Sequence, residues 1–213
     1  MIAAVVLAAG VSSRMGEPKQ TLLLDGVPML QRVLEIFHKS NVERVIVVLG
    51  ANAVEVKKRV KFAHELVVVN PRFAEGMSSS LRLGLEKVTR EEGAVIIALG
   101  DQPFVLPTTI DMLVSAYNKS GAHIVVPTYQ GARGNPVLFD KSVFSQLARI
   151  RGDVGAKSVV QKNSADVLEV EVPDKGVLVD IDTLVDLEGG TEVMRKRNRA
   201  RAVHLHGRPS PAS

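Results

Sequence analysis

The sequence contains no cysteine and no tryptophan in its 213 residues. Without cysteine the protein has no disulfide, iron–sulfur cluster, thiolate zinc site or cysteine nucleophile. This composition suits a reducing compartment, and we expect the protein to be cytoplasmic. Aromatic residues make up only 4% of the chain, whereas hydrophobic residues make up 46%. The core is therefore expected to be aliphatic, built on Val, Leu, Ile and Ala.

Long apolar runs are also missing. No run approaches the roughly 18 residues that a membrane-spanning helix requires, so we expect no association with a membrane. Residues 1–10 are apolar, but no basic residue precedes them, and Arg14 and Lys19 follow closely. A signal peptide has a basic segment before its apolar one, so we interpret this stretch as a buried first strand.

Acidic residues are absent from the C-terminal end. Residues 195–213 hold six basic side chains and no acidic one, which exceeds the formal net charge of +4 for the whole chain. Such a tail can contact nucleic acid or a membrane surface, but a solvated, disordered terminus has the same composition. The rest of the chain has no basic, aromatic-rich face, so nucleic acid is not an expected partner. We predict one domain over residues 1–190 and a basic, disordered tail over 191–213.

Short apolar runs alternate with amphipathic stretches along the chain. This alternation is typical of βαβ units and predicts an α/β fold, in which helices cover both faces of a mostly parallel sheet. Strands are expected at 2–7, 44–49, 66–69, 94–99, 124–126 and 167–172, with an extended piece at 177–181. The polar, glycine-bearing residues 130–135 and the short apolar run 136–139 are interpreted as a strand-loop excursion from the sheet. Helices are expected at 28–39, between 50 and 61, at 78–87, from a cap at Thr108 or Thr109 to 118, at 141–148 and at 154–161, with a helical turn at 184–188.

The loop after the first strand, residues 7–19, is rich in small residues and carries two cations. Ligands of open parallel sheets bind at the carboxyl ends of the strands, where this loop lies. Glycine lets successive N–H groups point into one concavity, and Arg14 and Lys19 add positive charge, so the loop suits a triphosphate. It is neither a Walker A loop nor a Rossmann fingerprint, because Met15 and Ser12 replace the respective second glycines. An ordinary strand-to-helix loop with surface cations explains the composition equally well.

A second segment, residues 71–80, follows the third predicted strand. Gly76 precedes the serines Ser78, Ser79 and Ser80 at a helix start. Amide and hydroxyl groups at such a position can hold a phosphate or the edge of a base. A helix cap with spare serines is the simpler interpretation of this segment alone.

A third segment, residues 98–104, places Asp101 directly after a buried strand. Mg²⁺ needs few protein carboxylates, because phosphate and water supply its other ligands. Asp101 is therefore a candidate ligand, with Asp182 as the second and Asp180 in reserve. A turn before Pro103 explains Asp101 as well.

These segments together resemble a known family. Residues 7–19 read Leu-Ala-Ala-Gly-x-Ser-Ser-Arg-Met-Gly-x-x-Lys, which is similar to the signature of the MobA-like nucleotidyltransferases. Residues 100–103 resemble the metal-binding segment of that family. The segments 133–139, 152–156 and 180–183 resemble its molybdenum cofactor cytidylyltransferase branch. The resemblance covers residues 1 to about 187.

The resemblance implies a single-domain, Rossmann-like fold of the pyrophosphorylase type. It implies transfer of CMP from CTP to molybdopterin-bound molybdenum cofactor with release of pyrophosphate. Members of the branch serve enzymes of the xanthine dehydrogenase type, which makes a molybdoenzyme a possible partner. Ala8-Ala9-Gly10 favours CTP over other nucleoside triphosphates, because guanylyltransferase relatives usually read Ala-Gly-Gly at this place.

Roles for individual residues follow from the resemblance and from the charge chemistry of phosphate transfer. The catalytic candidates are Arg14, Lys19 and Asp101, and Asp101 with Asp182 would bind Mg²⁺. The nucleotide-binding candidates are Leu7, Ala8, Ala9, Gly10, Ser12, Arg14, Lys19, Gly76, Ser78, Ser79 and Asp101. The acceptor-binding candidates are Gln102, Pro103, Arg133, Gly134 and Asn135.

Three alternatives remain open from the sequence. The protein could be a guanylyltransferase acting on molybdenum cofactor, or it could transfer a nucleotide to a sugar or polyol phosphate. It could also be a nucleotide-binding accessory protein without activity, although such a protein has no need of Lys19, Asp101 and Asp182. The five histidines receive no functional role.

Overall fold

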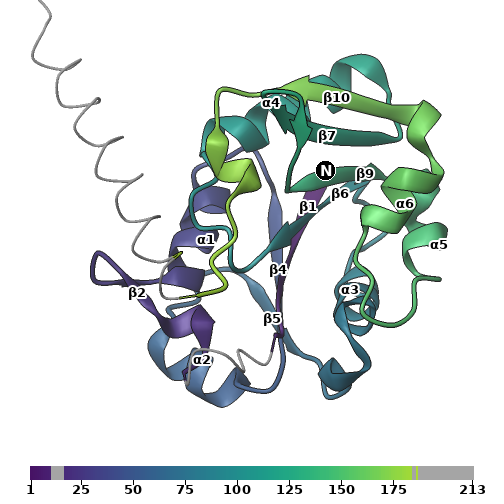
Figure 1. Cartoon of the computed structure of the whole chain (residues 1–213). Coiled ribbons are helices and arrows are strands. Elements are labelled where there is room, and N and C mark those ends of the chain that lie inside the picture. Colours follow the sequence, from purple (N-terminus) through teal and green to yellow (C-terminus); the bar gives the residue numbers. More distant parts are fainter. Residues whose placement is uncertain (11–16, 184–185, 187–213) are drawn as a thin grey trace, which may run out of the picture.

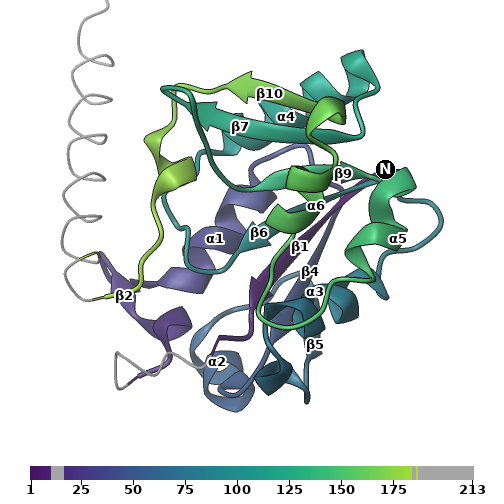
Figure 2. The same ribbon diagram turned by 45° about the vertical axis from the view of Figure 1, so that its right-hand side comes forward.

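The structure, a computed structural model, describes residues 1–10, 17–183 and 186 (Figure 1). Its centre is an eight-stranded sheet of order β10-β7-β9-β6-β1-β4-β5, with β8 paired to β7 off this path. Helices cover both faces of the sheet (Figures 1 and 2). The predicted α/β fold with a mostly parallel sheet is confirmed.

β1 (Ile2–Ala8) is the central strand, and all of its residues are buried. It pairs in parallel with β4 (Arg44–Leu49) on one side and with β6 (Ala94–Leu99) on the other. β5 (Leu66–Val69) lies beyond β4, again in parallel. Such strands are apolar on both faces because a layer of helices covers each face. Their carboxyl ends meet at one edge of the sheet, which brings the loops after β1 and β6 together.

The other half of the sheet contains one reversed strand. β9 (Val137–Asp140) runs antiparallel to β6 and to β7 (Ile124–Tyr129), whereas β10 (Val167–Glu171) runs parallel to β7. The short strand β8 (Ala132–Arg133) forms a hairpin with β7. The excursion from the sheet that we expect at residues 130–139 is wrong, because β8 and β9 both pair with strands of the central sheet.

One face of the sheet packs against three helices through alternate residues of β1, Ala4 and Val6 among them. These helices are α1 (Met29–His38), α2 (Ala53–Arg59) and α4 (Pro107–Ser120). The buried residues of these helices and strands form one cluster that is aliphatic apart from Phe37, and the partly buried Phe62 and Tyr117 pack against it.

The opposite face carries the other residues of β1, including Val5 and Leu7. It packs against α3 (Met77–Leu85), α5 (Phe144–Leu147) and α6 (Lys157–Lys162). α3 lies close to the sheet, since a Cβ at Gly84 would come within 2.4 Å of Val5 Cγ1. None of the helices in the described part of the chain is long and apolar enough to cross a bilayer.

Smaller elements connect these layers. β2 (Leu23–Leu24) and β3 (Val27–Pro28) form a separate two-stranded sheet. Asp25 and Gly26 join them with φ angles of 47° and 78°, as a tight hairpin turn requires. The 3₁₀ helices are Lys19–Thr21, Phe73–Glu75, Lys141–Val143, Ser164–Asp166 and Lys175–Leu178.

The last of these helices corrects the prediction of an extended piece at 177–181. Lys175–Leu178 is a 3₁₀ helix, and the extended backbone resumes only at Val179. Close packing explains the difference, because a Cβ at Gly176 would lie 2.2 Å from the carbonyl oxygen of Phe104. The helical turn predicted at 184–188 lies outside the described residues, apart from Asp186.

The predicted cap of α4 at Thr108 or Thr109 is also wrong. The helix begins at Pro107, and its N-cap residue, Leu106, has no side-chain hydrogen bond to the helix. The fully buried carboxylate of Asp174 accepts hydrogen bonds from the Leu106 amide at 2.7 Å and from the Thr109 hydroxyl at 2.8 Å. A residue far along the chain therefore performs the capping that the local sequence was expected to supply.

Candidate active site

A cleft of about 500 Å³ lies at the carboxyl edge of the sheet. The loops that follow β1 and β6, the start of α3 and the segment around Asp182 contribute to its wall. Its lining residues are Leu7, Ala8, Ala9, Gly10, Lys19, Gln20, Phe73, Gly76, Met77, Ser80, Leu99, Gly100, Asp101, Asp153, Asp180 and Asp182. Most nucleotide-binding candidates and both metal-binding candidates are thus brought to one cavity.

Two glycines hold the loop after β1 in place. The Gly100 amide donates a hydrogen bond to the Leu7 carbonyl at 2.9 Å, and a Cβ at Gly100 would lie 2.8 Å from Ala8 Cβ. On the other side, a Cβ at Gly50 would come within 2.3 Å of the Ala9 carbonyl oxygen. The small residues of this loop therefore serve close packing between neighbouring loops, in addition to any approach of a ligand.

Gln20 is a site residue that the sequence did not indicate. Its side chain is only 3% exposed, and Nε2 donates hydrogen bonds to the carbonyl oxygens of Ala8 at 2.9 Å and Gly10 at 3.3 Å. The carbonyl oxygens of the loop are thus bound from within the protein. This arrangement fixes the path of the backbone along the floor of the cleft.

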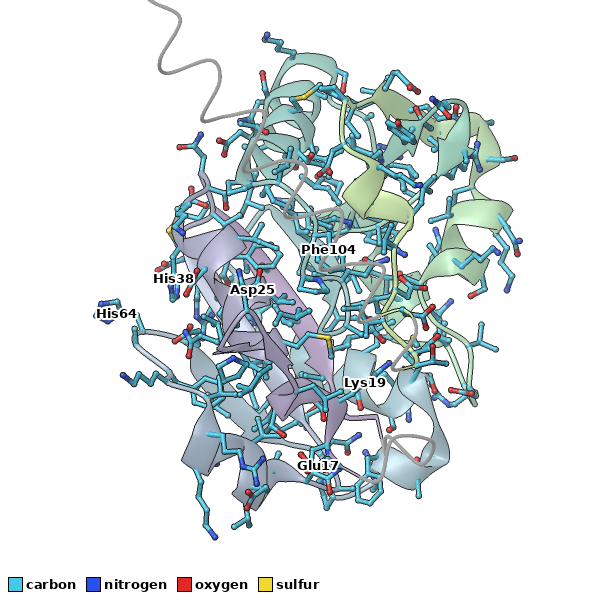
Figure 3. All side chains as sticks on the ribbon, turned by 60° about the vertical axis from the view of Figure 1, so that its left-hand side comes forward. Glu17, Lys19, Asp25, His38, His64 and Phe104 are labelled. Atoms are coloured by element: carbon cyan, nitrogen blue, oxygen red, sulfur yellow. The ribbon has the colours of Figure 1, made fainter. Side chains whose placement is uncertain are left out.

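Lys19 lines the cleft and lies between two carboxylates. Its Nζ atom is 2.6 Å from Asp101 Oδ2 and 2.8 Å from Asp182 Oδ1, and it donates to the carbonyl oxygen of Ile181 at 3.4 Å. The Ile181 amide in turn donates to the Asp101 carbonyl at 3.0 Å, which ties the two acidic segments together. Figure 3 shows Lys19 well separated from His38 and His64 at the edge of the molecule.

The pKa values of both Lys19 and Asp101 are raised in this cluster. Burial lowers the pKa of Lys19, but the charges and hydrogen bonds of Asp101 and Asp182 outweigh it, so the pKa is raised overall. Burial raises the pKa of Asp101, and Lys19 offsets this only in part, while Asp180 and Asp182 raise the pKa further. Lys19 is therefore firmly protonated, whereas the Asp101 carboxylate would gain from additional positive charge.

The same residues fit a divalent cation. Oδ1 of Asp101 is buried and has no hydrogen-bond partner among the described residues, while Oδ2 faces Lys19. Carboxylate oxygens are the ligands that Mg²⁺ and Mn²⁺ prefer. No group of three or more acidic or histidine side chains converges on one point within residues 1–10, 17–183 and 186. A metal here would therefore depend on phosphate and water for its remaining ligands.

The predicted serines are placed differently from the rest of the nucleotide-binding set. Gly76 lines the cleft, but Ser78 and Ser79 are buried and are not among the lining residues. The Ser79 hydroxyl lies 2.9 Å from the carbonyl oxygens of both Arg72 and Gly76, and it accepts a hydrogen bond from Asn70 at 2.8 Å. These contacts are internal to the protein.

Two amide groups at the start of α3 donate hydrogen bonds to residues 152–153. The Met77 amide donates to Asp153 Oδ1 at 3.2 Å, and the Ser78 amide donates to the Gly152 carbonyl at 3.3 Å. Gly76 permits this approach, because its φ is 96° and a Cβ there would lie 2.7 Å from the Gly152 carbonyl. The sequence motif at 152–156 had marked the branch of the family, but it had not placed Asp153 in the wall of the cleft.

A second cavity of about 520 Å³ adjoins the cleft and shares Leu7, Met77 and Leu99 with it. It brings the predicted acceptor residues Arg133, Gly134 and Asn135 together with Lys157 and Gln161 at the rim of an apolar wall. Arg133 is paired with Glu169, since Nη2 lies 2.6 Å from Glu169 Oε1.

The other two acceptor candidates do not line either cavity. Gln102 is buried and donates a hydrogen bond from Nε2 to Asp180 Oδ1, while Pro103 is buried beside it. Of the remaining candidates, Ser12 and Arg14 lie outside the described residues.

The position of the cleft and its cluster of charges agree with the class of enzyme that the comparisons give, a nucleotidyltransferase. The chain belongs to the MobA-like NTP transferase domain family, whose sequence model matches residues 4–167. The match begins within β1 and ends at the start of β10, so it includes the loops that carry Lys19, Gly76, Asp101 and Arg133.

Individual relatives are similar at modest identity. The molybdenum cofactor cytidylyltransferase of Escherichia coli strain K12 is 26% identical over 84% of this chain and 90% of that protein. The nicotine blue oxidoreductase of Paenarthrobacter nicotinovorans is 28% identical over 86% of this chain and 93% of that protein. The chain spans only 29–36% of the length of several bifunctional GlmU proteins that it also matches.

A solved structure extends the likeness to the whole fold. Rv0371c from Mycobacterium tuberculosis H37Rv, in complex with manganese, is 31% identical. The superposition covers 90% of this chain and 97% of that chain with a TM-score of 0.78.

Proposed function

We propose that the protein transfers CMP from CTP to a molybdopterin-type molybdenum cofactor and releases pyrophosphate. The observation that carries this proposal is the position of Lys19 and Asp101 in the cleft, directly beside the small-residue loop Ala8-Ala9-Gly10. The cytidylyltransferase relative and the Ala-Ala-Gly sequence of the loop favour CTP and this acceptor.

The reaction needs no protein nucleophile. An oxygen of the acceptor's phosphate attacks the α-phosphorus of CTP and forms a new O–P bond. The bond from the α-phosphorus to the bridging oxygen breaks, and that oxygen leaves with the electron pair as part of pyrophosphate. A phosphate monoester is largely dianionic near neutral pH, because its second pKa is about 6, so a strong general base is unnecessary.

Neutralising negative charge is then the main task of the protein. Lys19 and Arg14 would bind the phosphates, and the loop 7–10 with Gly76 would hold the nucleoside. Asp101 and Asp182 would hold Mg²⁺, which supplies positive charge to the transferred and departing phosphates. The buried oxygen of Asp101 without a partner among the described residues supports this assignment.

The acceptor would enter the second cavity. Its apolar wall suits a flat heterocycle, and Arg133, Asn135 and Lys157 at its rim suit an anionic group. Because this cavity shares Leu7, Met77 and Leu99 with the cleft, an acceptor there would lie next to the nucleotide. Arg133 would exchange Glu169 for the acceptor's phosphate.

We assign the activity to residues 1–190 and place the protein in the cytoplasm, with a molybdoenzyme as the recipient of its product. The absence of cysteine is compatible with a reducing compartment. Residues 191–213 lie outside the described part of the chain and are given no role in the reaction.

The decisive assay measures pyrophosphate release with Mg²⁺, each of the four nucleoside triphosphates and molybdenum-loaded molybdopterin. Release with CTP alone supports the proposal, and release with GTP would move the protein to guanylyl transfer. Release only with sugar or polyol phosphates as acceptors would change the substrate class. No release under any condition would contradict the proposal and direct attention to redox chemistry, given the relative named as an oxidoreductase.

A further inference from the structure

Lys19 occupies the carboxylates that are expected to bind the divalent cation. Its Nζ atom contacts one oxygen of Asp101 and one of Asp182, at 2.6 Å and 2.8 Å. These carboxylates are the expected ligands of the divalent cation, whereas the expected partners of Lys19 itself are the phosphates of the nucleotide. The position of Lys19 therefore differs from the one that the reaction requires.

We propose that Lys19 is a resident counter-ion of the Asp101–Asp182 pair, which competes with the divalent cation until the nucleotide's phosphates draw the ammonium group away. This proposal rests on the metal assignment of the proposed function. It adds that the metal-binding pair is closed by an internal cation while no nucleotide is bound. Metal and nucleotide would consequently bind with positive coupling.

Charge is the physical reason for the exchange. Two carboxylates that approach a common point repel each other, and burial of Asp101 makes its negative charge more costly still. The ammonium group neutralises the pair in the absence of metal. A divalent cation at the same oxygens would repel the ammonium group, and a triphosphate offers that group other anionic oxygens.

The exposed fractions of the three side chains indicate that a cation would enter the cluster from the side of Asp182. The side chain of Lys19 is 16% exposed and that of Asp101 is 21% exposed, whereas that of Asp182 is 59% exposed. A cation can therefore approach Asp182 directly from solvent. Release of Lys19 would also free Oδ2 of Asp101, whose second oxygen is already buried without a partner among the described residues.

The test measures binding of Mn²⁺ alone to the full-length, nucleotide-free protein. The concentration of free Mn²⁺ is determined by electron paramagnetic resonance. We expect Lys19→Gln to bind Mn²⁺ about tenfold more tightly than the wild type, since the internal competitor is removed. Lys39→Gln removes one positive charge from an exposed i,i+4 pair outside the cleft and should leave the affinity unchanged. Lys19→Arg keeps the competing charge and should remain close to the wild type.

The Asp101→Asn variant distinguishes an error in the metal assignment from an error in the role of Lys19 as competitor. If Lys19→Gln and the wild type bind Mn²⁺ equally, and Asp101→Asn weakens binding, the metal assignment stands and the role of Lys19 as competitor is overturned. If Asp101→Asn leaves binding unchanged, the metal site lies elsewhere, and both the assignment and the inference fail. Should Lys19→Gln prove unfolded by near-ultraviolet circular dichroism, Lys19→Met serves in its place. A Lys19→Arg affinity as tight as that of Lys19→Gln would also overturn the competition.

Discussion

Lys19 Nζ and Asp101 Oδ2 lie 2.6 Å apart, although the two residues are 82 positions apart in the chain. The contact joins the loop after β1 to the loop after β6. These two strands pair in parallel, with Leu7 opposite Leu99 near their carboxyl ends. It places one firm positive charge and one costly negative charge at the point where phosphate transfer is proposed.

Replacement of Lys19 should impair the chemical step. Lys19→Ala is expected to lower kcat by roughly thirtyfold to a thousandfold, a loss of about 2–4 kcal/mol in transition-state stabilisation, as for removal of one oxyanion-stabilising group. Steady-state pyrophosphate release at saturating CTP measures this effect. Lys39→Ala is the control, and a Lys19→Ala rate near that of the wild type would remove Lys19 from the mechanism.

Replacement of Asp101 should abolish the dependence on metal. Asp101→Asn keeps the shape of the side chain but removes the charge that would hold Mg²⁺, so activity should fall to background at every Mg²⁺ concentration. Asp25→Asn, in the β2–β3 turn, changes a carboxylate outside the cleft and should retain full activity. A folded Asp101→Asn protein that still responds to Mg²⁺ would place the metal elsewhere.

The loop after β1 should not tolerate a larger residue at Gly50. Gly50→Ala would place a Cβ within 2.3 Å of the Ala9 carbonyl oxygen, so the loop must shift. We expect a loss of about 1–3 kcal/mol in the free energy of unfolding, as for other overpacked sites, together with a higher KM for CTP. Urea denaturation and kinetics test the two effects. Gly93→Ala, where the nearest atom is 3.9 Å away, should change neither.

The cap of α4 should matter more than surface ion pairs. Asp174→Ala would leave the Leu106 amide and the Thr109 hydroxyl without their acceptor in a buried place. The free energy of unfolding should fall by about 1–3 kcal/mol, the cost of buried unsatisfied donors. Glu35→Ala removes only the exposed pair with Lys39 and should cost less than about 1 kcal/mol in the same urea experiment. Equal effects of the two variants would contradict the assigned cap.

Acid should weaken the protein through Glu92. Burial raises the pKa of Glu92, but hydrogen bonds from Thr89 and Arg44 outweigh it and hold the pKa below its ordinary value of 4.5. A lowered pKa in the folded state stabilises the fold above the ordinary pKa, and this stabilisation is lost as pH falls through the folded pKa. The stability difference between wild type and Glu92→Gln should therefore shrink as the pH falls below the ordinary pKa of 4.5 and through the lower pKa of the folded state. A difference that is constant with pH would exclude this linkage.

Much of the fold could be predicted from local patterns. The apolar runs gave the strands of the sheet to within a few residues, because a strand covered on both faces by helices must be apolar on both faces. The excursion from the sheet expected at residues 130–139 was wrong, since the hydrogen-bond partners of β8 and β9 are strands β6 and β7, which local sequence does not reveal. The predictions at 177–181 and at the start of α4 were wrong because close packing of Gly176 and the distant carboxylate of Asp174 decide those places.

The candidate site was predicted only in outline. The sequence indicated Lys19, Asp101 and Asp182 by their residue type and their place after strands, but not that one ammonium group would join the two carboxylates. Ser78 and Ser79 had the composition of a phosphate-binding turn, yet their hydroxyl and amide groups are used inside the protein. Gln20 carried no local signal that would distinguish it from a surface residue, and the motif at 152–156 did not place Asp153 in the wall of the cleft.

The sequence by itself determined the class of fold and the loop after β1 that lines the cleft, because periodicity and glycine placement act through neighbouring residues. The family followed from the resemblance of its short motifs to those of known nucleotidyltransferases. The tertiary structure decided which loops meet. Lys19 reaches Asp182 across 163 positions, and Asp174 reaches Thr109 across 65. Contacts of this kind depend on the order and direction of strands in the folded sheet, so no short stretch of sequence contains them.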